Sequence, residues 1–318
     1  MRILFTGASS FTGSWFVRTL AAAGHEIVAT FRSPLTAYEG VRARRVADAA
    51  AAAEPVADVS FGSPRFLDLL RGQSFDVLCH HAAEVTGYRS PNFDVEAAVA
   101  LNTHELDSVL GLLAENGTPV VLTGTVFESN EGAGDEPLHA FSPYGLSKTL
   151  TAEIFTSRCR EAGIGLGKFV IPNPFGPWEE PRFTSYLART WLGGEAALVQ
   201  TPAYVRDNVH VTLLALAYAR FVENVASSQA LSGGFRHLGP SGYVETQGEF
   251  SERCARELEA RLGVACPVEL VEQVDFPEPR ERVNTDPLDP AELGWDEARA
   301  WDELAAYYLD AHASGALA

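Results

Sequence analysis

A tyrosine and a lysine spaced four residues apart are the residues in this sequence best suited to catalysis. They belong to the segment Ser142-Pro143-Tyr144-Gly145-Leu146-Ser147-Lys148, in which serine is a favoured helix cap and proline suits a first helical turn. Side chains four apart share one helical face, so Tyr144 and Lys148 can point at one ligand. A phenol beside an ammonium can protonate a carbonyl oxygen while hydride arrives at the carbon, or catalyse the reverse. The spacing therefore predicts carbonyl–alcohol redox chemistry; an exposed aromatic beside a solvated lysine is the alternative.

Two threonines close to a predicted strand end are candidates for a second contact with the same oxygen. Thr123 stands at the carboxyl end of a strand expected over residues 119–123, where it can hydrogen-bond and steady the carbonyl that Tyr144 protonates. Thr125 is the competing candidate. Because threonine is also common in turns, both residues can instead serve only the local backbone.

A glycine-rich turn near the N-terminus predicts a phosphate-binding site. The segment Thr6-Gly7-Ala8-Ser9-Ser10-Phe11-Thr12-Gly13 lies where a first strand passes into a first helix. Gly7 permits a tight turn, Gly13 lets helix and strand pack closely, and the free N–H groups of the helix start can face a pyrophosphate. A serine here can add a hydroxyl donor or merely cap the helix. The expected cofactor contacts are Gly7, Ser9, Ser10, Phe11, Thr12 and Gly13.

The residue after the second predicted strand bears on the choice of cofactor. An acidic side chain that would hold a ribose 2′-hydroxyl is absent, and Arg32 stands there instead. An arginine can pair with a 2′-phosphate, so the sequence favours NADP, with NAD as the alternative. Arg32 can otherwise be a solvated loop residue.

Short apolar runs alternate with amphipathic stretches through the first half of the chain. Strands are expected at 3–6, 26–31, 76–80, 119–123 and 165–171, and helices at 11–23, 95–116 and 144–162, the three helices each followed by a glycine. The alanine-rich segment 43–59 fits either a helix or a loop. This rhythm predicts an α/β protein with a Rossmann-type, doubly wound parallel sheet, whose ligands bind beyond the carboxyl ends of the strands.

The texture of the sequence changes after Ile171, where Pro172-Asn173-Pro174-Phe175-Gly176-Pro177 interrupts regular structure. We therefore expect a dinucleotide-binding Rossmann domain over residues 1–171. Residues 172–318 are expected to form mainly a smaller α/β substrate-binding domain, with a return to the first domain around residues 206–238.

Composition narrows the class of protein further. The chain has 318 residues, 46% of them apolar, and a formal charge of −18, which repels nucleic acid. The four cysteines form no CxxC pair, and no histidine cluster has metal-ligand spacing, so neither a disulfide framework nor a metal site is expected. No run suits a signal peptide or a membrane span, and reduced thiols fit a cytoplasmic location.

These motifs together resemble the extended short-chain dehydrogenases/reductases that modify nucleotide sugars, the NAD-dependent epimerase/dehydratase type. The resemblance covers nearly the whole chain. TGASSFTG resembles the family's TGxxGxxG, except that Ser10 replaces the middle glycine, and YGLSK matches its YxxxK. Aligning Val126-Phe127 with the family places Thr123 in the role of its catalytic Ser/Thr. The C-terminal Leu293-Gly294-Trp295 also recurs there.

The resemblance implies further contacts. Asp58 and Val59 look like the pair at the adenine, while Ala82, Ala83, Asn102 and Ile171, with Tyr144 and Lys148, are expected beside the cofactor. Asn173 resembles the asparagine at the substrate diphosphate, and Arg206 the arginine that holds the nucleotide phosphates; an ion pair with Asp207 or another carboxylate is the alternative for Arg206. Glu84 and Thr86 are candidates for the sugar pocket or ordinary loop residues. His80 and His81 are expected to be packed or hydrogen-bonded within the protein rather than catalytic, because Tyr144 supplies the proton.

One departure from the family bears on the reaction. The 4,6-dehydratases carry Asp-Glu after the catalytic threonine, whereas this chain has Gly124 and Thr125, which do not titrate. We therefore expect reduction of the 4-keto group of a nucleotide-linked deoxysugar with NADPH, and Val126-Phe127 is more like the 4-ketoreductases. The alternatives are a 4-epimerase with tightly bound NAD, a reductase of a non-nucleotide ketone, and a cofactor-binding protein without chemistry. The family also implies a homodimer.

Overall fold

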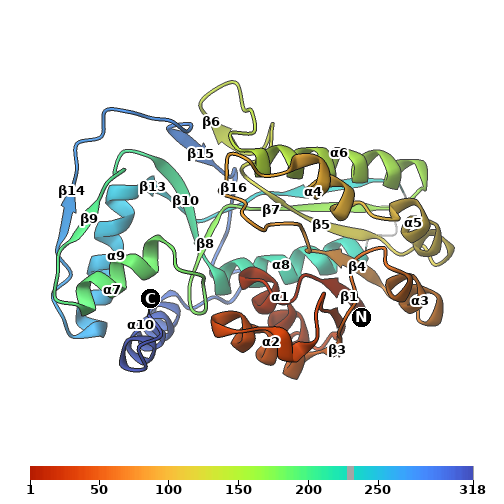
Figure 1. Cartoon of the computed structure of the whole chain (residues 1–318), viewed down its shortest axis with the longest axis horizontal. Coiled ribbons are helices and arrows are strands. Elements are labelled where there is room, and N and C mark those ends of the chain that lie inside the picture. The colour runs from red at the N-terminus through yellow and green to blue at the C-terminus, as the bar shows by residue number, and fades with distance from the viewer. Residues whose placement is uncertain (228–232, 318) are drawn as a thin grey trace. The chain divides into compact units, whose positions relative to one another are not determined.

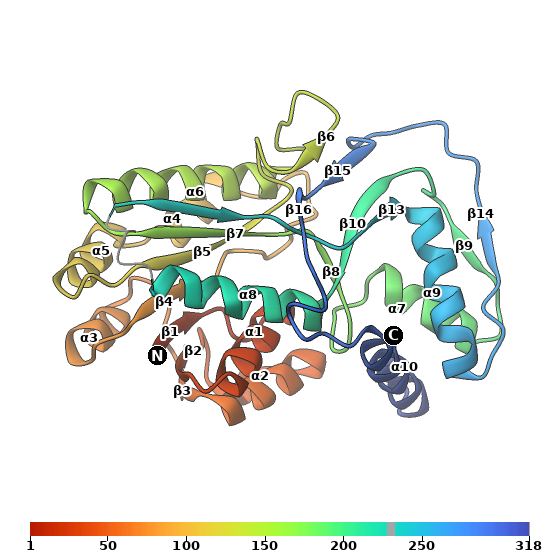
Figure 2. The same cartoon turned by 180° about the vertical axis from the view of Figure 1, so that it is seen from behind.

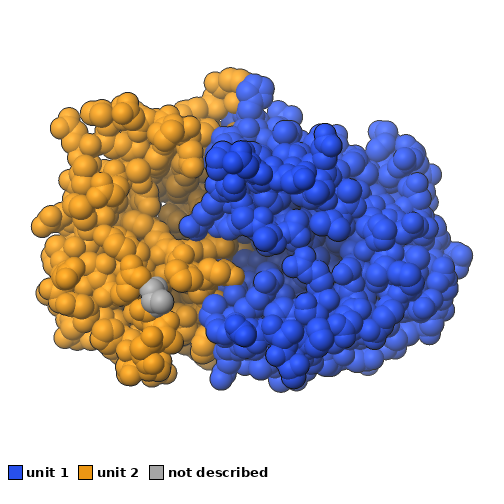
Figure 3. All heavy atoms as spheres, viewed as in Figure 1, with its two compact units in different colours: residues 1–131, 138–171, 215–239 blue, residues 132–137, 172–214, 240–318 orange. Residues whose placement is uncertain are grey.

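The computed structural model describes residues 1–227 and 233–317, which form two compact units (Figure 3). Unit 1 comprises Met1–Glu131, Leu138–Ile171 and Ala215–Gly239, and unit 2 comprises Gly132–Pro137, Pro172–Leu214 and Pro240–Ala318. Compared with the expected domains, the short segment Gly132–Pro137 joins unit 2, and the return to unit 1 begins at Ala215 rather than near residue 206. Residues 228–232 of that return lie outside the described residues.

Unit 1 is built on one seven-stranded sheet in which every neighbouring pair of strands is parallel. The strands, in spatial order, are β3 (Glu54–Val56), β2 (Glu26–Thr30), β1 (Arg2–Thr6), β4 (Val77–His80), β5 (Val120–Thr125), β7 (Leu166–Ile171) and β11 (Phe235–Leu238). The central strands β4 and β5 are buried along their whole length, as expected for a sheet covered on both faces. The predicted Rossmann-type α/β fold is therefore confirmed.

Helices cover both faces of this sheet (Figures 1 and 2). One face carries α1 (Phe11–Ala22), α2 (Gly40–Ala52) and α8 (Val211–Ala226), and the other carries α3 (Pro64–Gly72), α4 (Val95–Asn102), α5 (Leu106–Glu115) and α6 (Pro143–Glu161). A single turn, η1 (Leu35–Ala37), precedes α2. Alternate residues of β5 face opposite layers: Leu122 joins the aliphatic core under α3, α5 and α6. Thr123 points to the other face, where its register partner Phe169 packs against Tyr218 of α8.

The structure differs from the sequence-based prediction for one helix and resolves one segment that the sequence left undecided. The single helix expected over 95–116 is wrong, because the chain forms α4 and α5 with a break between them. The Thr103 hydroxyl bonds back to the Val99 carbonyl at 2.8 Å at the end of α4, and Glu105, the N-cap of α5, adopts a left-handed conformation with φ of 50°, which interrupts the helical backbone between the two. The undecided segment 43–59 becomes most of α2 followed by β3.

Unit 2 contains a small mixed sheet and three helices. The sheet consists of β13 (Tyr243–Thr246), β10 (Val205–His210), β15 (Glu281–Val283) and β6 (Ala133–Gly134), with β8 (Asn173–Phe175) also pairing with β10. Two further strand pairs are β9 (Ala197–Val199) with β14 (Val268–Leu270), and β12 (Pro240–Ser241) with β16 (Asp286–Pro287). The helices α7 (Phe183–Leu192), α9 (Gln247–Leu262) and α10 (Glu297–Ala313) enclose a core that includes Trp191, Phe250 and Trp301.

Candidate active site

The glycine turn between β1 and α1 has the geometry of a phosphate cradle. Gly7 has a φ of 84°, and a Cβ there would lie 2.7 Å from the Ala82 amide nitrogen. A Cβ on Gly13 would lie 2.3 Å from the Gly7 carbonyl oxygen. Both positions therefore require glycine, because their backbone packs directly against the loop after β4 and against the turn itself. The first-turn N–H groups of a helix attract an anion, so these residues fit a dinucleotide pyrophosphate.

Ser10, which stands at the family's middle glycine, holds this turn together. Its hydroxyl accepts a hydrogen bond from the Gly13 amide at 3.0 Å and donates one to the Gly7 carbonyl at 2.9 Å. Ser10 is the N-cap of α1, as a serine in this position favours. The serine therefore keeps the turn closed without the conformational freedom of glycine.

Two arginines lie near the carboxyl end of β2, on the side expected for a ribose. Arg32 donates to the Glu84 carboxylate at 3.1 Å, and 62% of its side chain is exposed. Arg42 of α2 donates to the Ser9 hydroxyl at 3.3 Å and stacks over the Tyr38 ring. Sequence reasoning missed Arg42, although the arginine-rich run at residues 42–45 was the available signal.

Glu84 links Arg32 to the loop that follows β4. Its second carboxylate oxygen accepts the Thr86 amide at 2.7 Å. Although burial raises the pKa of Glu84, hydrogen bonds from Thr86 and Arg32 lower it overall. The carboxylate is therefore charged, and a bound ribose phosphate would compete with it for Arg32.

The remaining expected cofactor residues lie at the carboxyl ends of the parallel strands. Asp58 has a φ of 58°, and the Val59 amide bonds to the Phe31 carbonyl at 3.0 Å, which places this pair beside the end of β2. The Ala82 amide donates to Thr6 of β1 at 3.1 Å, and Ala83 follows it in the same loop. At the end of β7, the Ile171 carbonyl accepts the Val126 amide at 3.0 Å.

Asn102 is placed differently from the residues around it. Only 3% of it is exposed, and both ends of its carboxamide are used within the protein. Its oxygen accepts the Glu84 amide at 2.8 Å, and its nitrogen donates to the Thr151 hydroxyl at 3.2 Å. This arrangement favours a role in holding the loop after β4 against α6 over direct contact with a cofactor.

The tyrosine–lysine motif opens α6 beside the end of β5. Ser142 caps the helix by accepting the Gly145 amide at 3.0 Å. The Tyr144 ring packs edge-on against Tyr88 and Phe93, with ring centroids 5.5 and 6.0 Å away. Lys148, four residues later, donates from Nζ to the Thr123 carbonyl at 2.7 Å. The structure therefore brings Lys148 and Thr123 into direct contact.

Lys148 is a buried ammonium, 5% exposed. Burial lowers its pKa, the nearby carboxylate of Glu128 opposes that shift, and the charge of Lys168 adds to it. Its hydrogen bond to a backbone carbonyl uses one of three N–H donors, so the ammonium keeps capacity for further polar groups.

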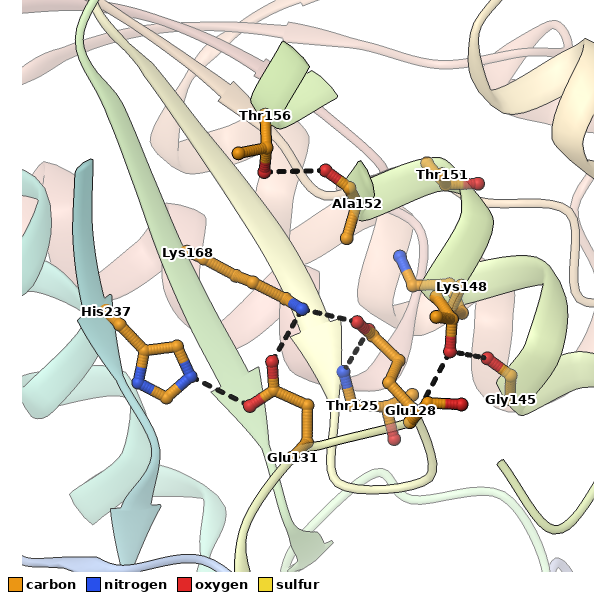
Figure 4. Close-up of polar contacts among 12 residues, drawn as sticks. Thr125, Glu128, Glu131, Gly145, Lys148, Thr151, Ala152, Thr156, Lys168 and His237 are labelled. Carbon is orange, nitrogen blue, oxygen red and sulfur yellow. Dashed lines mark hydrogen bonds and ion pairs between the residues drawn. The ribbon is translucent and has the colours of Figure 1, made fainter. Parts of the chain in front are cut away.

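A second buried ammonium lies next to this site and was not found from the sequence. Lys168 of β7 contacts Glu128 at 2.5 Å and Glu131 at 2.6 Å, and His237 of β11 lies 2.8 Å from Glu131 (Figure 4). The other Glu128 oxygen accepts the Thr125 amide at 2.8 Å. This charge network fixes Thr125 at the end of β5 and the turn that follows it.

The two histidines after β4 have separate polar partners. His80 lies between the Thr6 hydroxyl at 3.0 Å and the Asn102 carbonyl at 3.2 Å. His81 lies 2.9 Å from the Thr123 hydroxyl through Nδ1. Burial and the Lys148 charge lower the pKa of each imidazole to about 3, so both are neutral at physiological pH.

The two substrate residues expected in unit 2 lie on neighbouring strands. Asn173 pairs in register with Asn208 of β10, and its side-chain nitrogen is buried without a hydrogen-bond partner among the described residues. Arg206 stacks over Tyr204 and donates to Glu278 at 3.2 Å and to three carbonyls, those of residues 205, 279 and 280. Its carboxylate partner is therefore Glu278 and not Asp207.

In the described part of the chain no group of three or more His, Cys, Asp or Glu side chains could hold a metal ion. Nor does any helix described there have the length and apolar character needed to cross a bilayer. The four cysteines are free and buried.

A family model also matches the sequence that carries the glycine turn and the Tyr-Lys helix. The model for the "NAD dependent epimerase/dehydratase family" matches residues 3–232. The chain belongs to the NAD-dependent epimerase/dehydratase family. The resemblance to the extended short-chain dehydrogenases/reductases is thereby confirmed.

Solved structures share this fold over nearly the whole chain. The UDP-glucuronic acid 4-epimerase of Bacillus cereus, in complex with UDP-glucuronic acid and NAD, has a TM-score of 0.71 and 16% identity, covering 98% of this chain and 99% of that one. The UDP-glucose-4-epimerase of Stenotrophomonas maltophila, with NAD and formylated UDP-arabinopyranose, has a TM-score of 0.72 and 19% identity, covering 100% of both. The UDP-glucose 4-epimerase of Thermotoga maritima, with UDP-glucose, has a TM-score of 0.69 and 18% identity, covering 98% and 100%. No curated protein sequence matches the chain significantly.

Within this epimerase/dehydratase family, Gly124 marks a difference that the structure explains. A Cβ on Gly124 would lie 2.9 Å from both the Glu128 carboxylate oxygen and Lys168 Cε. The buried ion pair therefore fills the space that the family's dehydratase aspartate would need. Glu128 itself is fully buried and bound to Lys168 and the Thr125 amide, so it faces the protein interior.

Proposed function

We propose that this protein reduces the 4-keto group of a nucleotide-linked deoxysugar with NADPH. The observation that carries the proposal is the position of α6, which holds Tyr144 and Lys148 beside the carboxyl end of β5 with Lys148 bound to the Thr123 carbonyl. The glycine turn after β1 lies at the same edge of the parallel sheet, where ligands of such sheets bind.

Each residue of this arrangement has a distinct task. Tyr144 donates its phenolic proton to the substrate oxygen as the carbonyl becomes an alcohol. Lys148 stabilises the resulting phenolate through its charge and has two N–H donors left for ribose hydroxyls. Thr123 contacts the reacting oxygen, and Thr125 is the less favoured candidate because Phe127 and Glu128 bind it locally. The bound nicotinamide supplies the hydride.

The choice of NADPH over NADH rests on the two arginines beside β2. Arg32 replaces the acidic residue that would bind a 2′-hydroxyl, and Arg42 adds a second cation near Ser9. A 2′-phosphate would gain charge-assisted hydrogen bonds from both guanidinium groups. Titrating the protein with each cofactor tests this: NADPH should bind more tightly, and Arg42→Gln should remove most of the difference. Equal affinities would favour NAD.

Dehydration is disfavoured by the space around Gly124. The family's dehydratases place an aspartate there, whereas the Glu128–Lys168 pair fills the corresponding volume here. Neither Gly124 nor Thr125 can act as an acid or a base. Hydride transfer to a ketone remains the reaction that these side chains can perform.

The decisive experiment measures transfer of deuterium from NADPH to the sugar. Purified protein is incubated with nucleoside-diphosphate 4-keto-6-deoxysugars and NADPH deuterated at nicotinamide C4. We expect oxidation of NADPH and deuterium at C4 of the sugar, and neither should occur with Tyr144→Phe. Turnover only with ketones that lack a nucleotide would instead assign the protein to reduction of small free ketones.

A 4-epimerase is the second candidate, and the solved structures of the same fold favour it. Three of these, described above, are 4-epimerases, and two of the three contain bound NAD. An epimerase would purify with tightly bound NAD and interconvert UDP-sugars without net consumption of a cofactor. Denaturing the purified protein and analysing the released nucleotide separates the two candidates.

Asn173 and Arg206 are proposed to contact the nucleotide diphosphate. The Asn173 amide nitrogen is buried and lacks a protein hydrogen-bond partner among the described residues, so a ligand oxygen would satisfy it. The Arg206 guanidinium already binds Glu278, half of whose side chain is exposed and which a diphosphate could displace. Arg206→Gln should raise KM for a nucleotide sugar with little change in kcat.

We also propose a homodimer in the cytoplasm. Leu101 of α4 and Leu146 and Leu150 of α6 are large exposed apolar side chains on two helices that pack together. Their burial against a second copy would remove apolar surface from water. The buried free cysteines suit a reducing compartment. Sedimentation of the wild type and of Leu146→Glu tests the dimer.

A further inference from the structure

His81 connects the glycine turn to Thr123. Its Nε2 lies 3.0 Å from the Ser10 hydroxyl and 3.1 Å from the Thr12 hydroxyl, and its Nδ1 lies 2.9 Å from the Thr123 hydroxyl. The ring is fixed by Phe5 and Phe16, with centroids 5.7 and 5.2 Å away. One imidazole therefore contacts hydroxyls on both sides of the candidate active site.

The hydrogen positions in this series of hydrogen bonds, from Ser10 through His81 to Thr123, can be assigned by counting donors. Ser10 has one hydroxyl hydrogen, which it donates to the Gly7 carbonyl, while its oxygen accepts the Gly13 amide. The Ser10 contact with His81 is a hydrogen bond at the same time only if Nε2 carries the hydrogen. In the other neutral tautomer, two lone pairs would face each other across 3.0 Å, or Ser10 would abandon Gly7.

With the hydrogen on Nε2, Nδ1 can only accept. The Thr123 hydroxyl must then donate its hydrogen to His81. The imidazole stays neutral, because burial and Lys148 keep its pKa at about 3. Tyr218, which also neighbours the Thr123 side chain, is held as a neutral phenol by burial, which raises its pKa.

We propose that His81 is a positioning residue that directs the Thr123 hydroxyl hydrogen away from the substrate, so that Thr123 presents its oxygen as a hydrogen-bond acceptor. The inference rests on the proposed function for the identity of the reacting oxygen, but the hydrogen-bond chain itself does not. Thr123 then accepts a hydrogen bond from the sugar when the reacting group is a hydroxyl. Tyr144 is the donor when that group is a ketone. The role expected for Thr123, a donor that steadies the carbonyl, changes accordingly.

The same series of hydrogen bonds gives Ser10 a role in setting the tautomer of His81. A glycine at this position, as in the family's pattern, would leave the imidazole N–H with Thr12 as its remaining hydroxyl partner. Ser10 thus selects the tautomer of His81, and the tautomer sets the direction of the Thr123 hydroxyl. The cofactor turn and the threonine are thereby linked by a defined set of hydrogen positions.

Histidine-selective ¹⁵N NMR of the intact wild-type protein tests the chain without any turnover. The His81 signals, assigned with His81→Asn, should show a protonated Nε2 and an unprotonated Nδ1, unchanged between pH 8 and pH 5. In Ser10→Ala the Nδ1–H tautomer should become detectable. A wild-type Nδ1–H tautomer, or protonation of His81 above pH 5, would overturn the proposal.

Single-turnover kinetics test the action of His81 through Thr123. Started from the bound sugar alcohol and NADP, the direction in which Thr123 accepts the substrate hydroxyl, His81→Leu should slow hydride transfer roughly ten- to a hundredfold, the scale of a misplaced catalytic group, while cofactor affinity stays within about threefold. His81→Asn, whose side-chain oxygen can take the place of Nδ1, should recover much of the rate. Adding His81→Leu to Thr123→Val should cause no further loss.

The comparison with control variants separates the possible failures. His312→Asn, an exposed histidine on α10, should leave the rate unchanged. Multiplying effects of His81→Leu and Thr123→Val would show independent action and contradict the proposal. If no nucleotide sugar reacts with the wild type, the proposed function fails, while the tautomer measurement still decides the role of His81.

Discussion

Lys148 and Lys168 are the two lysines of a chain that otherwise uses 22 arginines for its positive side chains. Both are buried, yet their surroundings are opposite. Lys148 contacts a backbone carbonyl, and its pKa is lowered first by burial. Burial acts in the same direction on Lys168, but Glu128 and Glu131 outweigh it and raise the pKa. Similar burial therefore accompanies a lowered pKa in Lys148 and a raised pKa in Lys168, because, of the two lysines, only Lys168 is bound by carboxylates among the described residues.

This contrast explains why neither position carries arginine. A guanidinium cannot lose its proton and needs room for a planar fork, whereas an ammonium is compact and shifts its pKa readily. The proposed role of Lys148 calls for a compact charge on the same helix as Tyr144, and Lys168 must fit between two carboxylates beside Gly124. The two lysines thus lie at one turn, where the proposed role of Lys148 is chemical and Lys168 gives electrostatic support.

The largest expected effect is on the rate of hydride transfer, when Lys148 loses its charge. Lys148→Met removes the charge that stabilises the Tyr144 phenolate and the hydrogen bond to the Thr123 carbonyl. Hydride transfer should fall by about 10²- to 10⁴-fold, as for loss of an acid–base group. Stopped-flow absorbance of NADPH measures this. Lys148→Arg should remain strongly impaired; a rate close to wild type in Lys148→Arg would mean that charge alone suffices.

The next largest expected effect is on stability, when Lys168 loses its charge. Lys168→Met leaves two buried carboxylates without their cation, a loss expected to lower the free energy of unfolding by about 3–5 kcal/mol. Urea unfolding measures it. The matched control is Lys168→Met combined with Glu128→Gln and Glu131→Gln, which removes the stranded charges and should recover part of the stability. Equal destabilisation in both variants would show that packing, and not charge, is the contribution of Lys168.

A smaller but more direct effect is the pH dependence of the two ammonium groups. Because the chain has two lysines, ¹³Cε-lysine labelling gives two NMR signals, one titrating below the ordinary pKa of 10.5 and one above it. For Lys148 the unfolded chain binds more protons between the folded pKa and 10.5, so stability rises with pH there. For Lys168 the stabilisation is complete below 10.5 and is lost as pH rises through the folded pKa. Two signals that titrate together would remove the contrast.

Much of this architecture is readable from the sequence because its signals are local. The alternating strands and helices of unit 1, the cap at Ser142 and the glycine turn are each marked by residues adjacent in the chain. The break between α4 and α5 was not predicted, because a threonine hydroxyl that binds a backbone carbonyl does not alter the spacing of apolar residues.

The long-range polar contacts escaped for a different reason. Lys168, Glu128 and His237 come from separate segments, and only pairing of β5, β7 and β11 brings them together. The scarcity of lysine was the available signal, since a chain that favours arginine keeps lysine where arginine does not fit. His81 was expected to be packed or hydrogen-bonded rather than catalytic, and its link to Thr123 escaped because it depends on the distance between two strand ends.

The smallest expected effect lies at the outer end of the Lys168 network. His237 is about one-third exposed and lies 2.8 Å from Glu131, whose pKa is raised by burial but lowered overall by His237 and Lys168. The stability that Glu131 contributes is therefore present at neutral pH and is lost as pH falls through its folded pKa. His237→Ala should cost at most about 1 kcal/mol, because water can replace an exposed partner. His237→Gln, which keeps a donor, should cost less. A loss as large as that of Lys168→Met would place His237, and not Lys168, at the centre of the network.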